Sequence, residues 1–473
     1  MNGGAAASVP SFGIGILAPV TLLLLVLVVL AAVRIKSASG RFVLAALWAR
    51  YIFGAYHIYM FKPLFAGLSG NAVASIALTG VGLLVIRLRH LMLLALLPVY
   101  LLIILVLLSG VLNGDPSGSI GVAVKYAYFT IILIATFEAL RQDEEQKLMP
   151  LLLWAFAPLL LFQWLSLALN LPKGSELGGD IVWIGGYSHE AAFSLAMATA
   201  FMAACLARQL HPALRIAFMI AALTGIVLAG YRTAIFAVGP LALAAAWGVL
   251  TEYVRPEQRR PVAAVALVIV SACAALAILA FHERFADLVT FLSDPGSLIK
   301  PPREFTQLDR QVMSGRALIW SQYLYAYAAG TPTQMLFGFG AETWTKTFTV
   351  YPHNTLIGTL YELGAFGLGA MVLLWVSMFL LALRARGEER LMLAAAHLSF
   401  IILNFATMPF WQVEGLAFYG LLCGYTLFSG RAAAQRRRDA RSGSGRAPYR
   451  NRRSGPEIRP PRSGIQHSHY SRQ

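Results

Sequence analysis

Long apolar runs separated by short polar connectors dominate the chain. Each run has about 20 residues, enough for one α-helix to cross the hydrocarbon core of a bilayer. The pattern predicts an all-α, polytopic membrane helix bundle with about 12 to 13 transmembrane helices. The predicted spans are residues 12–33, 42–60, 72–87, 91–111, 118–139, 150–170, 189–207, 213–230, 233–251, 262–281, 354–384, 391–408 and 413–429.

Basic residues gather in every second connector, which sets the predicted orientation. Short basic loops stay in the cytoplasm, so this alternation places the C-terminus in the cytoplasm and one large loop, 282–352, on the outer side. The same alternation places segment 170–189 and turn 230–233 beside that loop. The basic connectors are 34–41, 87–90, 208–211, 255–260 and 384–390.

Composition supports a membrane bundle with a separate tail. Hydrophobic residues make up 58% of the chain and charged residues 13%, and the net charge is +16. Most of that charge lies after Arg431, in a segment rich in arginine, glycine, serine and proline. We expect 1–430 to form the bundle and 431–473 a disordered cytoplasmic tail lying on anionic lipid. Few aromatic residues accompany these arginines, so no nucleic-acid partner is expected.

Cysteine usage suggests neither disulfides nor a metal centre. The three cysteines, Cys205, Cys273 and Cys423, lie within apolar runs without paired spacing. The carboxylates on the predicted outer side are scattered along the chain. No metal and no cofactor are therefore expected.

Arg232 is the most informative single charge. It occupies a very short turn on the predicted outer side, where positive charge is disfavoured. Together with Arg310 and Arg316 of the large loop, it could bind an anionic group, because guanidinium pairs with phosphate through two parallel hydrogen bonds. Two other charges, Arg50 and Lys125, fall inside predicted spans and need partners that the sequence does not identify.

The large loop contains one predicted helix. Ser314 could cap it, and Arg316, Trp320, Tyr323 and Tyr327 would share one stripe at a spacing of about four residues. A helix lying on the membrane surface, without chemistry, explains the same spacing.

The stretch YPHNTLIGTLYELGAFG, 351–367, begins the next span with a histidine. As one continuous helix capped by Asn354, it would place Gly364 and Gly367 under His353 and Glu362 on the opposite side. The glycines would allow a second helix to approach closely. His353 could act as a base or as a polar anchor at the interface. Glu362 could simply be hydrogen-bonded to a neighbouring helix.

The sequence GGYSHEAAF, 185–193, opens another span on the same side. Ser188 as the helix cap, with Glu190 in the first turn, is a sufficient structural explanation of these two polar residues.

The stretch HNTLIGTLYELGAFG resembles the signature of the bacterial O-antigen ligase family, which is related to Wzy-type O-antigen and exopolysaccharide polymerases. The resemblance covers roughly residues 185–385. Its other supporting residues are Ser188, Glu190, Arg232, Ser314, Gly315, Arg316, Trp320, Gly338 and Gly340.

The resemblance implies a metal-independent membrane glycosyltransferase of the GT-C type, in the bacterial inner membrane. Its donor would be a glycan linked through diphosphate to undecaprenol, presented at the periplasmic face. The acceptor would be lipid A core for a ligase, or a growing glycan for a polymerase. In that chemistry Arg232, Arg310 and Arg316 are candidates to bind the diphosphate, and His353 is the candidate base, supported by Asn354.

Two hypotheses from other classes remain open. A transporter or flippase of a polysaccharide precursor would explain the spans and buried charges, and it predicts internal repeats with interrupted spans at matching positions. A structural subunit of a polysaccharide assembly complex would make the basic tail the important part.

Overall fold

The computed structural model describes residues 11–65, 68–143, 147–174, 181–265, 268, 299–310 and 312–441. In these ranges the fold is all-α, as predicted, apart from two short antiparallel hairpins. The first pairs β1, Pro63–Phe65, with β2, Leu68–Ser69; the second pairs β3, Lys173–Gly174, with β4, Ile181–Val182. Residues up to Ala433 form one compact unit, and the chain from Ala434 forms a second.

Eight α-helices precede the second hairpin in the described part of the chain. They are α1 Ile14–Arg34, α2 Ala38–Ala55, α3 His57–Met60, α4 Gly70–Val85, α5 Leu97–Leu112, α6 Pro116–Gln142, α7 Leu148–Leu152 and α8 Ala157–Ala168, with 3-10 turns η1 Leu88–Met92, η2 Leu94–Leu96 and η3 Leu153–Phe156.

Ten further α-helices with defined bounds follow the second hairpin in the described part of the chain. They are α9 Glu190–Leu206, α10 Pro212–Leu228, α11 Arg232–Ala237, α12 Gly239–Tyr253, α16 Arg316–Ala328, α17 Pro332–Phe337, α18 Trp344–Thr347, α19 Thr355–Ala382, α20 Gly387–Ala406 and α21 Val413–Arg441, with 3-10 turns η4 Pro302–Glu304, η5 Val312–Gly315 and η6 Pro409–Trp411.

Six helices in the described ranges are long and apolar enough to cross a membrane. They are Ile14–Arg34, Leu94–Leu112, Pro116–Gln142, Leu148–Ala168, Thr355–Ala382 and Gly387–Ala406. Three shorter apolar helices, α4, α9 and α10, coincide with further predicted spans. The predicted span 262–281 falls mostly outside the described residues, so the total of about 12 to 13 stays a prediction.

Helix α1 shows how one element meets two environments. Leu17, Leu24 and Val28 are buried, at spacings that place them on one helical face, whereas Leu30 and Val33 on the outside are exposed. A helix that is apolar on all sides can pack against protein with one face and against lipid with the other.

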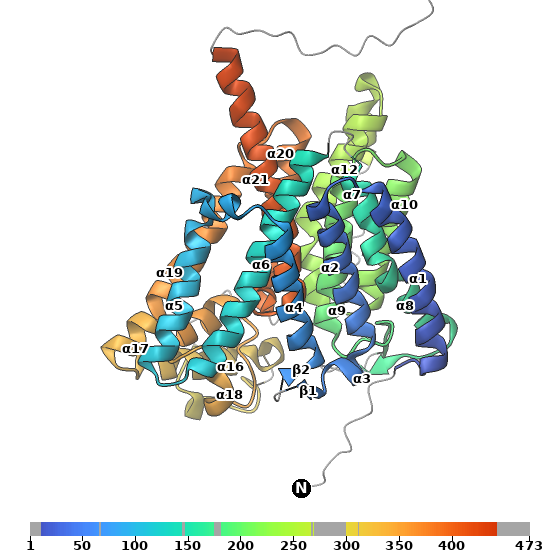
Figure 1. Ribbon diagram of the computed structural model, residues 1–473. Coiled ribbons are helices and arrows are strands. Elements are labelled where there is room, and N and C mark those ends of the chain that lie inside the picture. Colours follow the sequence, from blue (N-terminus) through green and yellow to red (C-terminus); the bar gives the residue numbers. More distant parts are fainter. Residues whose placement is uncertain are drawn as a thin grey trace, which may run out of the picture. The chain divides into compact units, whose positions relative to one another are not determined.

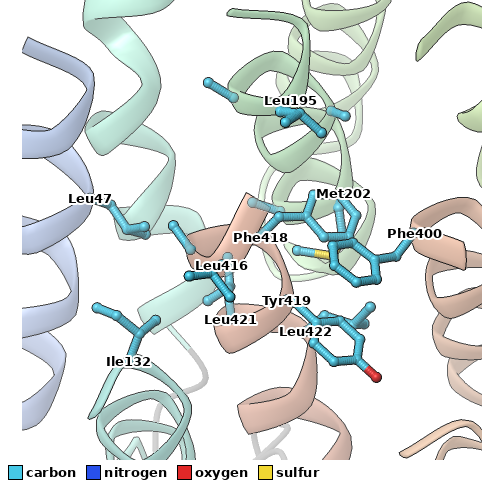
Figure 2. Packing of buried hydrophobic residues seen from close by; sticks show 14 of the residues in the cluster. Leu47, Ile132, Leu195, Met202, Phe400, Leu416, Phe418, Tyr419, Leu421 and Leu422 are labelled. Atoms are coloured by element: carbon cyan, nitrogen blue, oxygen red, sulfur yellow. The ribbon is translucent and has the colours of Figure 1, made fainter. Parts of the chain in front are cut away.

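Helix α21 lies at the centre of the packed core. Its Leu416, Tyr419 and Leu422 meet side chains from α2, α6, α9 and α20 (Figure 2). The Tyr419 ring stacks on Phe400 of α20 with 4.2 Å between ring centroids. A side chain at Gly424 would come within 2.5 Å of the Leu133 carbonyl oxygen of α6, so glycine is what lets these two helices pack so closely.

The structure supplies the partners of the two charges inside predicted spans. Arg50 of α2 pairs with Glu414 at the start of α21, with 2.9 Å between Nη2 and Oε1, and also donates to Asn71. Lys125 of α6 pairs with Glu342 before α18, with 2.7 Å between Nζ and Oε1. Charge pairing therefore accounts for both residues.

The expectation of one continuous helix through 354–367 is wrong at Gly364. This glycine has φ 68° and ψ −169°, which breaks the helical path of α19. The reason is α17, whose backbone packs against the break: a side chain at Gly364 would lie 2.4 Å from the Leu336 carbonyl. The backbone amides of Phe339 and Gly340 donate to the carbonyls of Tyr361 and Glu362, at 3.0 and 3.1 Å, and so satisfy carbonyls next to the break.

Helix α21 also corrects the predicted tail. It continues through residues 431–441, where the sequence predicted disorder, and the alanine, glutamine and arginine residues there are good helix formers. Residues 442–473 lie outside the described ranges.

The basic connectors lie at one end of the large unit. Following the chain in Figure 1, the connectors α1–α2, α9–α10 and α19–α20 lie at the end opposite to α16, α17 and α18. We call the end that contains α16–α18 the His353 end, because residues 350–354 lead from it into α19.

Candidate functional site

The His353 loop, residues 350–354, immediately precedes α19. His353 has the left-handed backbone angle φ 51°, which is uncommon for a residue with a side chain. Asn354 is the helix cap, as predicted: its Oδ1 accepts from the amides of Leu356 at 2.9 Å and Ile357 at 3.2 Å. Its Nδ2 donates to the Phe405 carbonyl at the end of α20. The histidine is thus fixed at a capped helix N-terminus.

Helix α16 holds the other side of this loop. Trp320 Nε1 donates to the Pro352 carbonyl at 2.8 Å, and Tyr323 Oη donates to the Val350 carbonyl at 3.0 Å. The two donors are three residues apart on one face of the helix, and both are buried. The predicted stripe of aromatic residues therefore exists. Trp320 and Tyr323 bind the backbone beside His353, whereas the Tyr327 hydroxyl donates to the Met335 carbonyl at 2.7 Å.

The N-terminus of α16 differs from the prediction in one respect. The cap position is Gly315, at φ 81°, one residue after the Ser314 that the sequence predicted. A glycine reaches this left-handed conformation without strain.

One aromatic ring of the loop lies directly beside His353. The Tyr351 ring lies 4.0 Å from the His353 ring between centroids, and Trp344 of α18 meets Tyr351 edge-on at 5.9 Å. All three side chains are partly exposed. The histidine is therefore accessible beside an aromatic surface.

Tyr231, in the turn between α10 and α11, links the distant segments of the site. Burial raises the pKa of the Tyr231 phenol; the Arg316 guanidinium opposes this shift, and Tyr351 and Glu190 reinforce it. Such direct electrostatic effects require short separations. The start of α9, the start of α16 and the His353 loop therefore each bring a side chain within electrostatic range of Tyr231 in the turn at 230–233.

The predicted cations differ in their positions. Arg232 begins α11, follows Tyr231 directly and is exposed, and Arg316 begins α16 and is partly exposed. Arg310 is exposed in the coil before η5, and within the described residues no contact joins its side chain to this group. Its neighbour Asp309 accepts from Lys300 at 2.7 Å, which lowers the pKa of Asp309 to about 2.

The start of α9 also differs from the prediction. The cap is His189, whose Nδ1 accepts from the Ala191 amide at 3.1 Å, so the expectation that Ser188 caps this helix is wrong by one residue. Ser188 contributes its carbonyl, which accepts from the buried Lys173 Nζ at 2.8 Å. Glu190 is in the first turn, as expected, and is buried.

Glu362 lies in a different environment from His353. Its side chain is 1% exposed, and its electrostatic neighbours are Glu342, Lys125 and the backbone amides of Glu342 and Trp344. Its carbonyl accepts from Ser109 Oγ of α5 at 2.9 Å. Gly364 and Gly367 serve α19 itself: Gly364 makes the break, and a side chain at Gly367 would strike Leu363.

The group of side chains around His353 suits anionic and polar ligands. Arg316, Glu190 and Tyr351 act electrostatically on Tyr231, the Tyr351 ring contacts the His353 imidazole, and Arg232 follows Tyr231 in the chain. Within the described ranges, no three His, Cys, Asp or Glu side chains are placed to hold a metal ion together.

Comparison with known families supports this resemblance over part of the chain. Residues 217–372 match the O-antigen ligase family. The match contains Tyr231, Arg232, Arg316, His353 and Glu362, and it confirms the resemblance drawn from the His353 motif. With the apolar helices, it indicates an integral membrane protein and supports a glycosyltransferase-type enzyme of polysaccharide biosynthesis. It does not favour a transporter. No curated protein matches the chain.

Sequence reasoning missed Tyr231, Tyr351 and Trp344. The available signal was adjacency: Tyr231 precedes Arg232 in GYRTA, and Tyr351 lies two residues before His353 in YPHN. In both stretches the sequence pattern pointed to the titratable neighbour, Arg232 or His353, and not to the tyrosine.

Proposed function

We propose that this protein transfers a glycan from an undecaprenyl-diphosphate carrier to an acceptor at the periplasmic face of the inner membrane. The proposal rests on one arrangement at one end of the bundle: Arg316, Glu190 and Tyr351 act electrostatically on Tyr231, and the Tyr351 ring contacts His353. The match over residues 217–372 supports the class of reaction. The basic connectors at the opposite end support a periplasmic position for the His353 end.

The proposed reaction is one substitution at an anomeric carbon. The acceptor hydroxyl oxygen forms a bond to that carbon while the bond from carbon to the diphosphate oxygen breaks. His353 accepts the hydroxyl proton, which strengthens the nucleophile. The lipid diphosphate leaves with the electron pair of the broken bond, and its added charge needs cations.

Arg232 and Arg316 are proposed to bind the departing diphosphate. Guanidinium groups pair with phosphate oxygens through parallel hydrogen bonds, so they can supply the charge that a metal supplies in other phosphate sites. We propose Arg310 only as an outer contact, because its exposed side chain has no described contact with the group. The mechanism is therefore metal-independent.

The acceptor distinguishes two versions of the proposal. A ligase would use lipid A core, and a polymerase would use a growing lipid-linked glycan. A deletion strain separates them on a gel. Polymer that accumulates on the carrier while long chains disappear from lipopolysaccharide identifies a ligase, whereas single repeats or lost secreted polymer identify a polymerase.

Replacing His353 or Arg232 with alanine should abolish transfer in that deletion strain. A green fluorescent protein fused after the C-terminus measures membrane insertion, which should match wild type. His211→Ala is the matched control, because His211 is exposed at the opposite end of the bundle. If the His353→Ala protein inserts into the membrane and still makes full-length product, His353 is not the catalytic base.

A further inference from the structure

Trp344 and Tyr351 form a partly exposed aromatic pair next to His353. Their ring centroids are 5.9 Å apart at an interplanar angle of 67°, and the Tyr351 ring is 4.0 Å from the imidazole. Large aromatic side chains usually gain stability by full burial. This pair instead keeps part of its surface open beside the proposed base.

Four further aromatic rings, of which Tyr323 and Tyr361 are buried, support the segment between Trp344 and Tyr351. Phe348 stacks on Tyr323 with 3.9 Å between centroids and meets Tyr361 at 5.2 Å. Tyr361 in turn stacks on Phe339 at 4.6 Å. With the bonds from α16 to the carbonyls of Val350 and Pro352, these contacts fix the backbone that carries Tyr351 and His353.

Strained backbone borders the pair on both sides. Glu342, two residues before Trp344, has φ 62°, and His353, two residues after Tyr351, has φ 51°. Such conformations cost of order 1 kcal/mol or more for residues with side chains and concentrate at ligand-binding and catalytic sites. Two ion pairs, Lys125 with Glu342 and Lys346 with Asp115, tie the α18 segment to α6 and to the α5–α6 turn.

We propose that Trp344 and Tyr351 bind a sugar ring of the acceptor glycan; this rests on the function proposed above. The C–H groups on the face of a pyranose carry slight positive charge, which suits the negative face of an aromatic ring. The hydroxyl groups of the sugar project from its edge. A ring lying on Tyr351 therefore presents one hydroxyl to the adjacent imidazole, while Arg232 and Arg316 remain available for the donor diphosphate.

Fluorine NMR tests the platform without requiring turnover. The full-length protein is labelled with 5-fluorotryptophan, and loss of one signal in Trp344→Phe assigns Trp344. Trp164, on the exposed side of α8, serves as the internal control. The probes are core oligosaccharide released from the native lipopolysaccharide and the delipidated single repeat unit.

At least one probe should shift the Trp344 signal saturably and leave Trp164 unchanged. No shift of Trp344 with either probe, or equal shifts of both tryptophans, overturns the platform. Because this measurement reports binding alone, it is independent of whether His353 is the base.

Kinetics in the full-length enzyme provides the second test. Trp344→Ala should raise the KM for the acceptor about 10-fold, which corresponds to one aromatic contact. The donor KM should stay unchanged, and Trp344→Phe should restore most of the affinity. An unchanged acceptor KM in Trp344→Ala overturns the proposal, as does an equal rise in both KM values, which would indicate a general structural role.

Discussion

At the scale of single residues, His353 is positioned by hydrogen bonds from other side chains to the backbone around it. Trp320, Tyr323 and Asn354 each bind the chain within three residues of it or fasten the helix that follows it. The histidine and the asparagine of the motif therefore depend on a helix well upstream in the chain. Trp320 is 32 residues from Pro352, and Tyr323 is 27 residues from Val350.

Replacing Trp320 with phenylalanine should lower kcat more than it changes KM. The change keeps a large ring in place and removes one hydrogen bond to Pro352, worth about 1 kcal/mol, so we expect a loss of roughly 5-fold in kcat. Steady-state kinetics on the purified protein measures it. Tyr325→Phe, on an exposed position of the same helix, is the control. Equal kcat in both variants would show that this bond does not position the loop.

At the scale of elements, the break in α19 shows what the sequence could and could not predict. Hydropathy placed the helix, and the cap at Asn354 followed from its position. The break did not, because Gly364 and Gly369 look alike inside an apolar run. Only the approach of α17 distinguishes them: the space beside Gly369 is open.

Alanine at these two glycines should have opposite effects. Gly364→Ala combines a disfavoured φ with a clash against the Leu336 backbone, so we expect a loss of at least about 2 kcal/mol of stability. Gly369→Ala fills open space in a helix and should stabilise by up to about 1 kcal/mol. Thermal unfolding in detergent, followed by fluorescence, compares them. Equal midpoints would contradict the described packing of α17 on α19.

Long-range partners were beyond sequence reasoning for a related reason. Arg50 and Glu414 are 364 residues apart, and Lys125 and Glu342 are 217 residues apart. The sequence did predict that both cations have partners, because an unpaired charge in an apolar span is costly. Which carboxylate pairs with each cation depends on how the helices pack. The same holds for Tyr231, whose neighbours come from three separate segments.

At the scale of the whole molecule, we expect the helix bundle to carry out glycan transfer without the basic tail. The end of α21 that belongs to the large unit includes Ala433, which is buried. A truncation therefore has to spare α21 if it is to test the tail alone.

Removing residues 442–473 should leave glycan transfer close to the wild-type rate, because every residue proposed for chemistry lies before Arg384. Complementation of the deletion strain, with insertion measured in parallel, provides the comparison. An inserted but inactive truncated protein would instead support the role of a structural subunit acting through its tail. A truncation after Arg431 should instead destabilise the protein, because it removes the packed end of α21.

Transfer by the purified, reconstituted protein is the most direct test of the central claim. The full chain in lipid nanodiscs is given a labelled undecaprenyl-diphosphate glycan and the acceptor identified in cells. The account predicts labelled product from wild type and His211→Ala, and a rate at least about 10²-fold lower from correctly folded His353→Ala. Product formed by His353→Ala at the wild-type rate would contradict it.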